Sequence, residues 1–393
     1  MTLSVRNEGP GDPRDAWRRL GELAVRGLQL TYADGRLPYT MRYVGSTAQP
    51  EGYSIRYALI ALLGLGKGVS VVGELGDLVR ALWKRVEAAD HSRLSPGDWG
   101  LGLWGRALHS GTGTAGGKWF ECERALSRLM AQAHGLDSVE LAWLLLGADH
   151  AMVHGIDDGS ASALATASRK ALLSLYNREI RLFYRHGRTG AWRGVSRRIA
   201  CFANQIYPLM ALAVHARTAN CGDSLGVARA VAEELCKLQG EYGQWWWLYD
   251  ARDGGVVDGY PVYSVHQDGM APMALYEAAA ARGGVVDDAI QRSLSWIWGG
   301  NEMNRRMVVD ADGLILRDIH RFGIGRLARM FEGVVRCAGL RSGRRSGATG
   351  KYEINSECRP YHLGWILYAA GLGCARHGET KAASRRQGES VHA

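Results

Sequence analysis

Apolar residues recur at helical spacing along most of the chain. Two of the clearest stripes hold aliphatic side chains at steps of three and four residues: Ile55, Ala58, Leu59, Leu62 and Leu63, then Ile206, Leu209, Met210 and Ala213. These steps place side chains on one helix face, so each stripe predicts an amphipathic helix. Strand-like alternation is nearly absent, and only residues 307–316 (MVVDADGLIL) predict a short hairpin. The chain is therefore predicted to be all-α.

The predicted helices recur in similar units. They end in glycine-rich stops such as GLGKG at 64–68 and ARGG at 281–284, and turns rich in Gly and Trp follow, as in DWGLGLW at 98–104. A helical hairpin that repeats in this way buries its apolar face against its neighbours. We therefore predict a single (α/α)6 toroid of antiparallel hairpins over residues 13–375. The polar ends, 1–12 and 376–393, are predicted to be disordered.

The composition limits which kinds of partner and which cellular compartment we expect for the protein. The 393 residues carry a formal charge of +9, but the arginines are spread along the chain without the aromatic interleaving of a nucleic-acid surface. We expect no nucleic-acid partner. The seven cysteines are odd in number and show no paired spacing, which predicts a reducing compartment. No signal-peptide core or membrane-spanning apolar run is evident, so we expect a cytoplasmic protein, with peripheral membrane contact left open.

The stretch LQGEYGQWWWLYDARD at 238–253 carries the first family resemblance. Gln239, Gly243 and Trp245 stand in the spacing Q-x3-G-x-W, which resembles the QW repeat of squalene and terpenoid cyclases. Residues 264–284 and 287–302 resemble the inner and outer helices that follow in those toroids. The physical reasons agree with the resemblance, because Gln can cap a helix end and Gly permits the turn. Trp245 would then seal the hairpin.

Two further stretches, 256–275 and 361–371, are similar to the β subunit of protein prenyltransferases, which belongs to the same superfamily. That family binds a catalytic zinc through an Asp, a Cys two residues on, and a His. Asp258 and His362 match the Asp and the His, but Tyr260 replaces the Cys. Cys358, one turn before His362, is a geometric substitute. Because thiolate supplies much of the affinity for zinc, we expect no stoichiometric zinc and no cofactor, with zinc or magnesium as the alternatives.

The acidic motifs of terpenoid chemistry are missing. Cyclases that protonate an alkene share an Asp-x-Asp-Asp motif, and ionising synthases share Asp-Asp-x-x-Asp, but neither occurs in the sequence. The pairs Asp157–Asp158 and Asp287–Asp288 lack the third acid. The resemblance therefore indicates fold better than activity.

The candidate catalytic residues are Asp258, His266 and Asp268. The segment that contains them passes directly into an apolar helix, whose start faces the central cavity in toroids of this type. An exposed histidine there can act as a general acid or base near neutral pH. A capping network at the helix start is the alternative.

Aromatic residues around this segment are the candidate walls of a substrate site. They are Trp246, Trp247, Tyr249, Tyr260 and Tyr263, with His362 as a further contact. Asn204 and Tyr207, one turn apart, resemble the Asn and Tyr of some toroidal polysaccharide lyases and epimerases. The alternative is that Asn204 caps its helix.

Indoles and phenols suit either an isoprenoid or a sugar ring. The main functional prediction is an isoprenoid-processing enzyme, a terpene cyclase or prenyltransferase of non-standard motif acting on a small hydrophobic substrate. The alternative is a carbohydrate-active toroid, a lyase, epimerase or glycoside hydrolase with a sugar substrate. A non-catalytic binding toroid is the second alternative.

Overall fold

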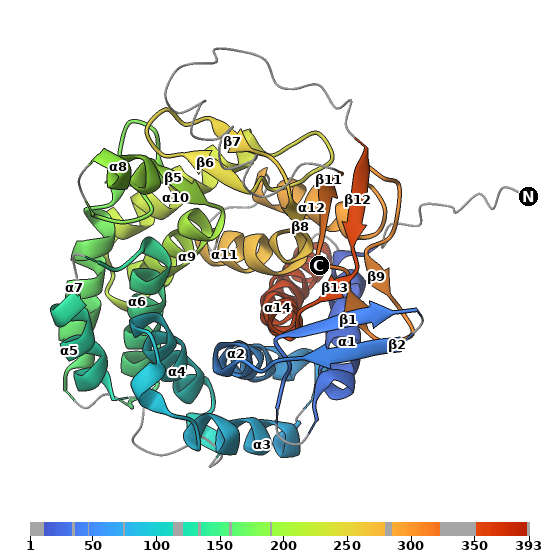
Figure 1. Ribbon diagram of the computed structural model, residues 1–393, viewed down its shortest axis with the longest axis horizontal. Coiled ribbons are helices and arrows are strands. Elements are labelled where there is room, and N and C mark those ends of the chain that lie inside the picture. The colour runs from blue at the N-terminus through green and yellow to red at the C-terminus, as the bar shows by residue number, and fades with distance from the viewer. Residues whose placement is uncertain are drawn as a thin grey trace, which may run out of the picture.

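The computed structural model places the helices in two concentric rings (Figure 1). It describes residues 12–33, 36–45, 47–73, 75–112, 121–132, 135–156, 159–188, 191–279, 285–322 and 351–390. The chain alternates between the two rings, so each outer helix runs back along its inner neighbour.

The inner ring is closed. In the described part of the chain its members are α2 (Ile55–Val72), α4 (Pro96–Leu108), α6 (Ser138–Val153), α9 (Ala203–Thr218), the π-helical turn η3 (His266–Met270) continued by α11 (Ala271–Ala278), and α14 (Pro360–Ser390). Each packs against the next, and α14 packs against α2. The toroid predicted from the hairpin repeat is confirmed at this level.

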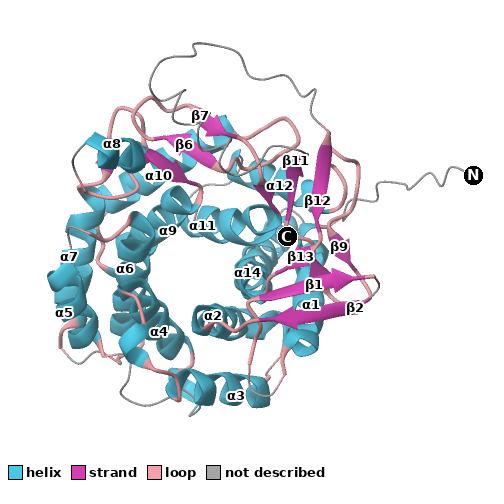
Figure 2. Cartoon of the chain, viewed as in Figure 1, coloured by secondary structure: helices cyan, strands magenta, loops and turns pink. Residues whose placement is uncertain are grey.

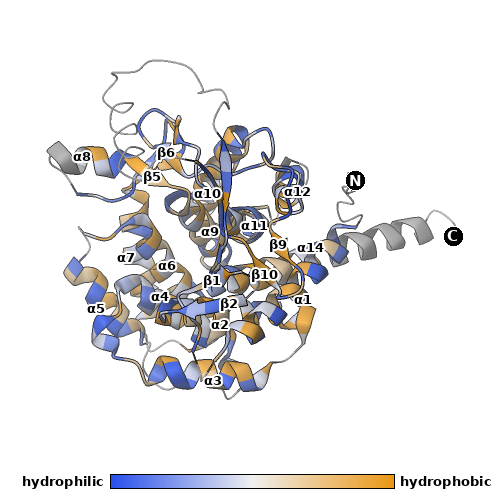
Figure 3. Cartoon of the chain, turned by 45° about the vertical axis from the view of Figure 1, so that its right-hand side comes forward, coloured by the Kyte–Doolittle hydropathy of each residue, from blue (hydrophilic) through white to orange (hydrophobic). Residues whose placement is uncertain are grey.

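The outer ring covers the inner one with amphipathic helices. Its described members are α1 (Pro13–Thr31), α3 (Gly76–Glu87), α5 (Cys122–Gln132), α7 (Ala161–Leu173), α10 (Gly222–Leu238) and α12 (Val285–Ile297). Figure 3 shows hydrophobic and hydrophilic positions alternating around α3 and α5. On α3 the buried residues are Val79, Leu82, Trp83 and Val86, at steps of three, one and three. The core therefore lies between the rings.

The structure also contains short strands, most of which the all-α prediction did not include. Three antiparallel sheets combine β1 (Thr40–Val44) with β2 (Thr47–Glu51) and β13 (Glu357–Cys358), β5 (Ile199–Cys201) with β6 (Leu248–Asp250) and β7 (Val256–Asp258), and β8 (Val262–Tyr263) with β11 (Asp318–Arg321) and β12 (Tyr352–Asn355). Hairpins join β3 (Tyr176–Asn177) to β4 (Leu182–Phe183) and β9 (Val308–Val309) to β10 (Leu314–Ile315). The last hairpin confirms the prediction for 307–316. The other strands are too short to show alternation in the sequence.

The remaining elements are small. Helix α8 (Ala191–Arg198) precedes β5, and two 3-10 turns, η1 (His91–Arg93) and η2 (Ser110–Thr112), flank α4. At the chain ends, residues 1–11 lie outside the described residues, and α14 continues to Ser390 through most of the segment expected to be a disordered tail. The disorder of both ends stays a prediction.

One helix among the described residues passes the length and composition test for a membrane span. It is α2, with a mean hydropathy of 1.6, and 56% of that window is buried inside the structure. An inner-ring helix has apolar neighbours on most sides, so it passes the same test without a membrane. The finding is weak support for a span.

The Gln-Gly-Trp turn after α10 has the predicted form. The Gln239 amide donates to the backbone oxygens of Gly243 at 2.8 Å and Ala289 at 2.9 Å. Gly243 has a φ of +79°, which favours glycine. Trp245 is fully buried, and its Nε1 donates to Ser293 Oγ at 3.0 Å on outer helix α12. The sealing role predicted for Trp245 is confirmed.

We expect Trp245→Ala to lower the free energy of unfolding by about 3–5 kcal/mol, because it leaves a large cavity in the core and removes the hydrogen bond to Ser293. Trp247→Ala is the matched control. Its ring is only half-buried, so its loss should be much smaller. Urea denaturation followed by circular dichroism measures both. Equal losses for the two variants would contradict the sealing role.

Candidate active site

Strands lead into four of the six described inner elements. β2 precedes α2, β5 precedes α9, β8 precedes η3, and β13 precedes α14. Figure 2 shows the labelled strands along the upper and right-hand parts of the ring in this view, where β1, β2 and β13 overlap α1 and α14. We call the N-terminal ends of the inner elements the strand-bearing end. The segments and side chains at this end form the candidate site.

The first turns of the inner helices carry polar side chains, and the second turns carry rings. Trp143 of α6 contacts Tyr207 of α9, with 5.2 Å between ring centroids, and Tyr207 contacts Trp365 of α14 at 5.8 Å. One turn deeper, Trp104 contacts Trp365 at 5.9 Å and Tyr368 at 5.2 Å. We call these five residues the aromatic floor. A ligand at the strand-bearing end would therefore rest above rings instead of passing through the toroid.

Asp268 and His362 form a buried dyad at the strand-bearing end. His362 Nε2 and Asp268 Oδ1 are 2.5 Å apart, and the residues come from the adjacent inner elements η3 and α14. Asp268 is fully buried, and its Oδ2 has no partner among the described residues. Burial raises the pKa of the Asp268 carboxyl, against the opposing effect of His362. The dyad can therefore hold a proton that a solvated carboxylate would lose.

His266 lies beside this dyad but is not the exposed cavity histidine that the sequence suggested. Only 8% of its surface is exposed, and its ring packs against Phe202 at 4.6 Å and Tyr263 at 5.3 Å. Burial, with a smaller effect of the nearby His362, lowers the pKa of His266 to about 3. An imidazole with this pKa stays neutral at physiological pH, so it can exchange a hydrogen bond but supplies no ready acid.

The low pKa of His266 predicts a pH dependence of folding. In the unfolded chain a histidine binds a proton below about pH 6.5, whereas folded His266 does so only near pH 3. Stability should therefore fall as pH drops from about 6.5 to about 3, by up to about 1.4 kcal/mol per pH unit for this residue. His266→Leu should flatten the slope measured by urea denaturation, while His154→Leu, on an exposed ring, should not. An unchanged slope in His266→Leu would refute the assignment.

Several predicted site residues lie elsewhere. Tyr260 donates from its hydroxyl to Glu302 at 2.8 Å, and its backbone N–H donates to Asp258 Oδ1 at 3.1 Å, so Asp258 closes a turn after β7. Trp246 Nε1 donates to the backbone oxygen of Leu238 at 2.7 Å, towards the outer ring. Tyr249 is fully buried in the core. The structure brings none of Asp258, Trp246, Tyr249 or Tyr260 into contact with the dyad.

Other predicted residues remain at the strand-bearing end. Trp247 and Tyr263 are half-buried, with 4.7 Å between their ring centroids. Tyr207 belongs to the aromatic floor. Asn204 is buried, where its Oδ1 accepts from Cys201 N at 3.0 Å and its Nδ2 donates to Ser138 Oγ at 3.0 Å. These bonds join the start of α9 to β5 and to α6. Asn204 is not the N-cap, however, because that position is Phe202 and has no side-chain cap bond.

Three arginines that the sequence analysis missed lie over aromatic rings at this end. Arg56 lies over Trp143, Arg317 over Tyr263 and Arg359 over Tyr39, with 5.4, 5.4 and 4.5 Å from guanidinium to ring centroid. Such pairs hold guanidinium groups in fixed positions. The three residues are far apart in sequence, so no local motif announces them.

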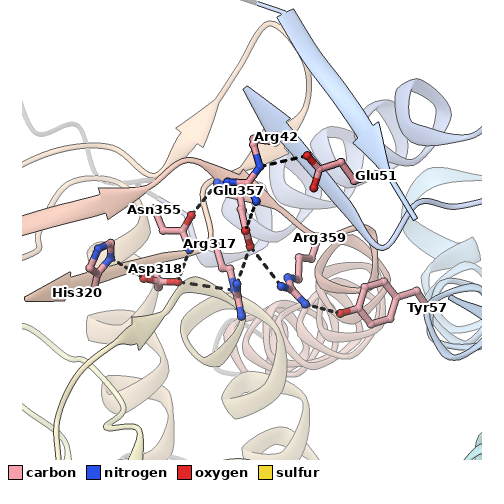
Figure 4. Close-up of polar contacts among 9 residues, drawn as sticks. All are labelled: Arg42, Glu51, Tyr57, Arg317, Asp318, His320, Asn355, Glu357 and Arg359. Atoms are coloured by element: carbon pink, nitrogen blue, oxygen red, sulfur yellow. Dashed lines mark hydrogen bonds and ion pairs between the residues drawn. The ribbon is translucent and has the colours of Figure 1, made fainter. Parts of the chain in front are cut away.

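Glu357 organises two of these arginines (Figure 4). It accepts from Arg317 at 2.6 Å, from Arg359 at 3.3 Å and from Arg42 of β1 at 2.9 Å. Arg359 also donates to the Tyr57 hydroxyl at 3.0 Å. Partial burial alone would raise the pKa of Glu357, but Arg317 and Arg359 outweigh it and lower the pKa. Glu51 and Asp318 lie beside Arg42 and Arg317, so these three arginines share three carboxylates.

A second acidic group lies across the ring, at the starts of α4 and α6. Arg56 Nε donates to Asp98 Oδ1 at 2.6 Å, and Asp98 forms a capping box with Ser95. Glu140 closes the equivalent box with Asp137 on α6. Burial raises the pKa of Glu140, and Asp137 adds to the effect. A cavity of about 540 Å³ lies beside Glu140 and not at the dyad.

The ligand set of a zinc site is not assembled in the described residues. They contain no group of three or more His, Cys, Asp or Glu side chains that could hold a metal ion. His362 pairs with Asp268, and Asp258 accepts a hydrogen bond from Tyr260 N. Cys358 is buried in β13 opposite Met41. The expectation that the protein binds neither zinc nor another cofactor stays a prediction.

The fold has close neighbours among solved structures, although no protein-family model and no curated protein matches the chain. A heparin-specific unsaturated glucuronyl hydrolase superposes with a TM-score of 0.58 at 13% identity, covering 94% of this chain and 98% of that one. The unsaturated glucuronyl hydrolase of Streptococcus agalactiae gives 0.60 at 12% identity, covering 92% of both chains. That of Bacillus sp. GL1 gives 0.56 at 14%, covering 91% of this chain and 96% of that one. At such identities the likeness shows the fold alone.

These neighbours correct the family assignment. They are glycoside hydrolases, not terpenoid cyclases or protein prenyltransferases. The predicted membership of that superfamily was therefore wrong, and so was the enzyme class derived from it. The carbohydrate-active alternative agrees better with the fold. The error arose because the Gln-Gly-Trp turn indicates only how two helices are joined. Toroids of unrelated activity can share such a turn.

Proposed function

We propose that the chain is a carbohydrate-active hydrolase that acts on a sugar carrying a carboxylate, with its reaction centre at the strand-bearing end. The fold neighbours named for unsaturated glucuronyl hydrolysis suggest the substrate class. The observation that carries the proposal is the dyad of Asp268 and His362, a proton-holding carboxyl whose second oxygen has no partner among the described residues.

The dyad has the chemistry that sugar hydrolysis needs. A general acid works best when its pKa lies near the working pH, and burial moves the Asp268 carboxyl in that direction. His362 shares the proton and is the more exposed partner at 4%. We assign the proton transfer to this pair. Neutral His266, beside it, is a hydrogen-bonding contact for the substrate.

The walls suit an acidic sugar better than a neutral one. Trp247 and Tyr263 offer half-buried ring faces on which a sugar can stack. Arg317 and Arg359 lie on the same side, and their guanidinium groups match the planar geometry of a carboxylate. Glu357 already accepts from both arginines, but each guanidinium has further N–H donors, which a uronyl carboxylate can accept from and a hydrophobic isoprenoid cannot.

The test is turnover of an unsaturated glucuronyl disaccharide from a glycosaminoglycan, followed by loss of the ultraviolet absorbance of its double bond. We expect this substrate to be consumed and its methyl ester to be consumed at least about tenfold less efficiently, because the ester loses a charge-assisted pair. Equal rates on both would refute the role of the arginines. Tight binding without any turnover would support the non-catalytic binding toroid instead.

A further inference from the structure

The inner ring carries a second polar group, deeper in the toroid than the dyad. Each of the six described inner elements, which surround the centre in Figure 1, supplies one side chain to it, more than two helical turns after the element begins. These side chains are Lys67 of α2, Trp104 of α4, His150 of α6, Arg217 of α9, Glu277 of α11 and Tyr368 of α14. We call them the inner polar cluster.

Direct contacts join the members of the cluster across neighbouring helices. The Lys67 ammonium lies over the Tyr368 ring, 5.8 Å from its centroid. Tyr368 meets Trp104 edge to face, with 5.2 Å between ring centroids, and Trp104 stacks on His150 at 5.4 Å. Residues from α2, α4, α6 and α14 therefore meet at one level of the inner ring.

The charges of the cluster do not cancel. Arg217 forms an ion pair with the Glu277 carboxylate. Lys67 has no carboxylate partner among the described residues. Burial, with smaller effects of Lys67, His154 and Arg217, lowers the pKa of His150 to about 3, so this imidazole is neutral at physiological pH. The uncompensated positive charge of the cluster is the one on Lys67.

Three polar atoms of the cluster are buried without a hydrogen-bond partner among the described residues. They are Trp104 Nε1, His150 Nε2 and the Tyr368 hydroxyl. Trp104 and Tyr368 are themselves fully buried. An indole N–H can only donate, and a phenol hydroxyl can donate as well. Buried polar atoms in native proteins are nearly always paired, with protein, water or an ion. Two donors beside an ammonium group suit an acceptor that carries negative charge.

We propose that the inner polar cluster binds a small monovalent anion, a halide or a small carboxylate, between Lys67, Trp104 and Tyr368. Lys67 is only half-buried, and its flexible stem lets the ammonium move off the Tyr368 ring to meet the anion. Trp104 and Tyr368 donate hydrogen bonds to it. Because its partners come from α2, α4 and α14, the bound anion stabilises the closed inner ring. The site is separate from the proposed reaction centre and does not depend on it.

Thermal unfolding in chloride and in acetate tests the site. Each anion replaces isethionate, a bulkier sulfonate, at fixed ionic strength, so that general screening of charge stays constant. We expect the Tm of the unchanged protein to rise with chloride, acetate or both, and the anion that raises it identifies a halide or a carboxylate site. Lys67→Met should weaken the apparent Kd obtained from this rise at least about tenfold, the loss of one charge-assisted hydrogen bond.

Lys84→Met is the matched control. Lys84 is also a cation near a helix C-terminus, in the last turn of outer helix α3, so it reproduces any effect of Lys67 on the helix dipole. Its response to both anions should equal that of the unchanged protein. Tyr368→Phe, which removes one hydroxyl, decides the question if Lys67→Met does not fold, and it should also weaken the apparent Kd.

Two results would overturn the proposal. The first is a Tm of the unchanged protein that does not change with either anion, because the polar atoms of the cluster would then bind water. The second is an equal response in Lys67→Met, Tyr368→Phe and the unchanged protein, because the anions would then bind elsewhere. Neither measurement involves turnover, so the anion site and the proposed hydrolysis can fail separately.

Discussion

Asp268→Asn should reduce kcat on an unsaturated glucuronyl disaccharide by about 10²–10⁴-fold, the range for loss of a general acid or base. Asparagine has nearly the same shape and can still hydrogen-bond to His362, so folding should survive. It cannot hold or deliver a proton. The measurement is kcat and KM by ultraviolet absorbance, with thermal unfolding of each variant as the check on structure.

A second buried dyad supplies the matched control. Asp149 lies 3.0 Å from His215 Nδ1 and is also fully buried, with its pKa raised by burial. Both residues lie near the C-terminal ends of α6 and α9, far along their helices from the strand-bearing end. Asp149→Asn should therefore leave kcat unchanged. If it reduces kcat as strongly as Asp268→Asn, buried Asp–His pairs serve folding at both ends and the assignment of the dyad is wrong.

The ring architecture was readable from the sequence because it depends on local patterns. Apolar steps of three and four residues define helices that need a neighbour, and the Gln239–Trp245 spacing defines how two of them are joined. These features act within one or two turns of helix. They predicted the closed toroid and the sealing tryptophan, and the structure confirms both.

The candidate site was only partly readable, because it is assembled over long sequence distances. Asp268 was predicted as a site residue, but its partner His362 lies 94 residues away and was taken from a zinc-binding resemblance instead. The run of three tryptophans misled in another way. Adjacent residues alternate direction, so Trp245 seals the core, Trp246 turns outward, and only Trp247 remains at the strand-bearing end.

The isoprenoid substrate class was predicted in error because the residues that argue against it are far apart in the sequence. Aromatic residues alone suit an isoprenoid or a sugar. What favours an acidic sugar is the set of arginines stacked on those rings, and Arg56, Arg317 and Arg359 come from three separate parts of the chain. In the sequence nothing distinguishes these three arginines from the rest of the 48 lysines and arginines. Only the folded chain brings Arg317 and Arg359 to Glu357, with Arg56 across the ring from them.

Gly364→Ala should destabilise the toroid by more than about 4 kcal/mol, or prevent it from folding, because α2 and α14 meet there backbone to backbone. A Cβ at Gly364 would lie 2.6 Å from the backbone oxygen of Ile60, and one at Gly64 would lie 2.1 Å from that of Gly364. Neither neighbour is a side chain that can swing away. The two helices would have to separate along the contact that closes the inner ring.

Gly378→Ala is the matched control on the same helix. Nothing lies within 4 Å of a Cβ at that position, so alanine should be neutral or stabilise α14 by up to about 1 kcal/mol through helix propensity. Urea denaturation and soluble yield measure both variants. A Gly364→Ala protein as stable as Gly378→Ala would mean that α2 and α14 can pack further apart without loss. The closed ring would then not depend on the glycine contact, and the positions of Asp268 and His362 at its end would need another support.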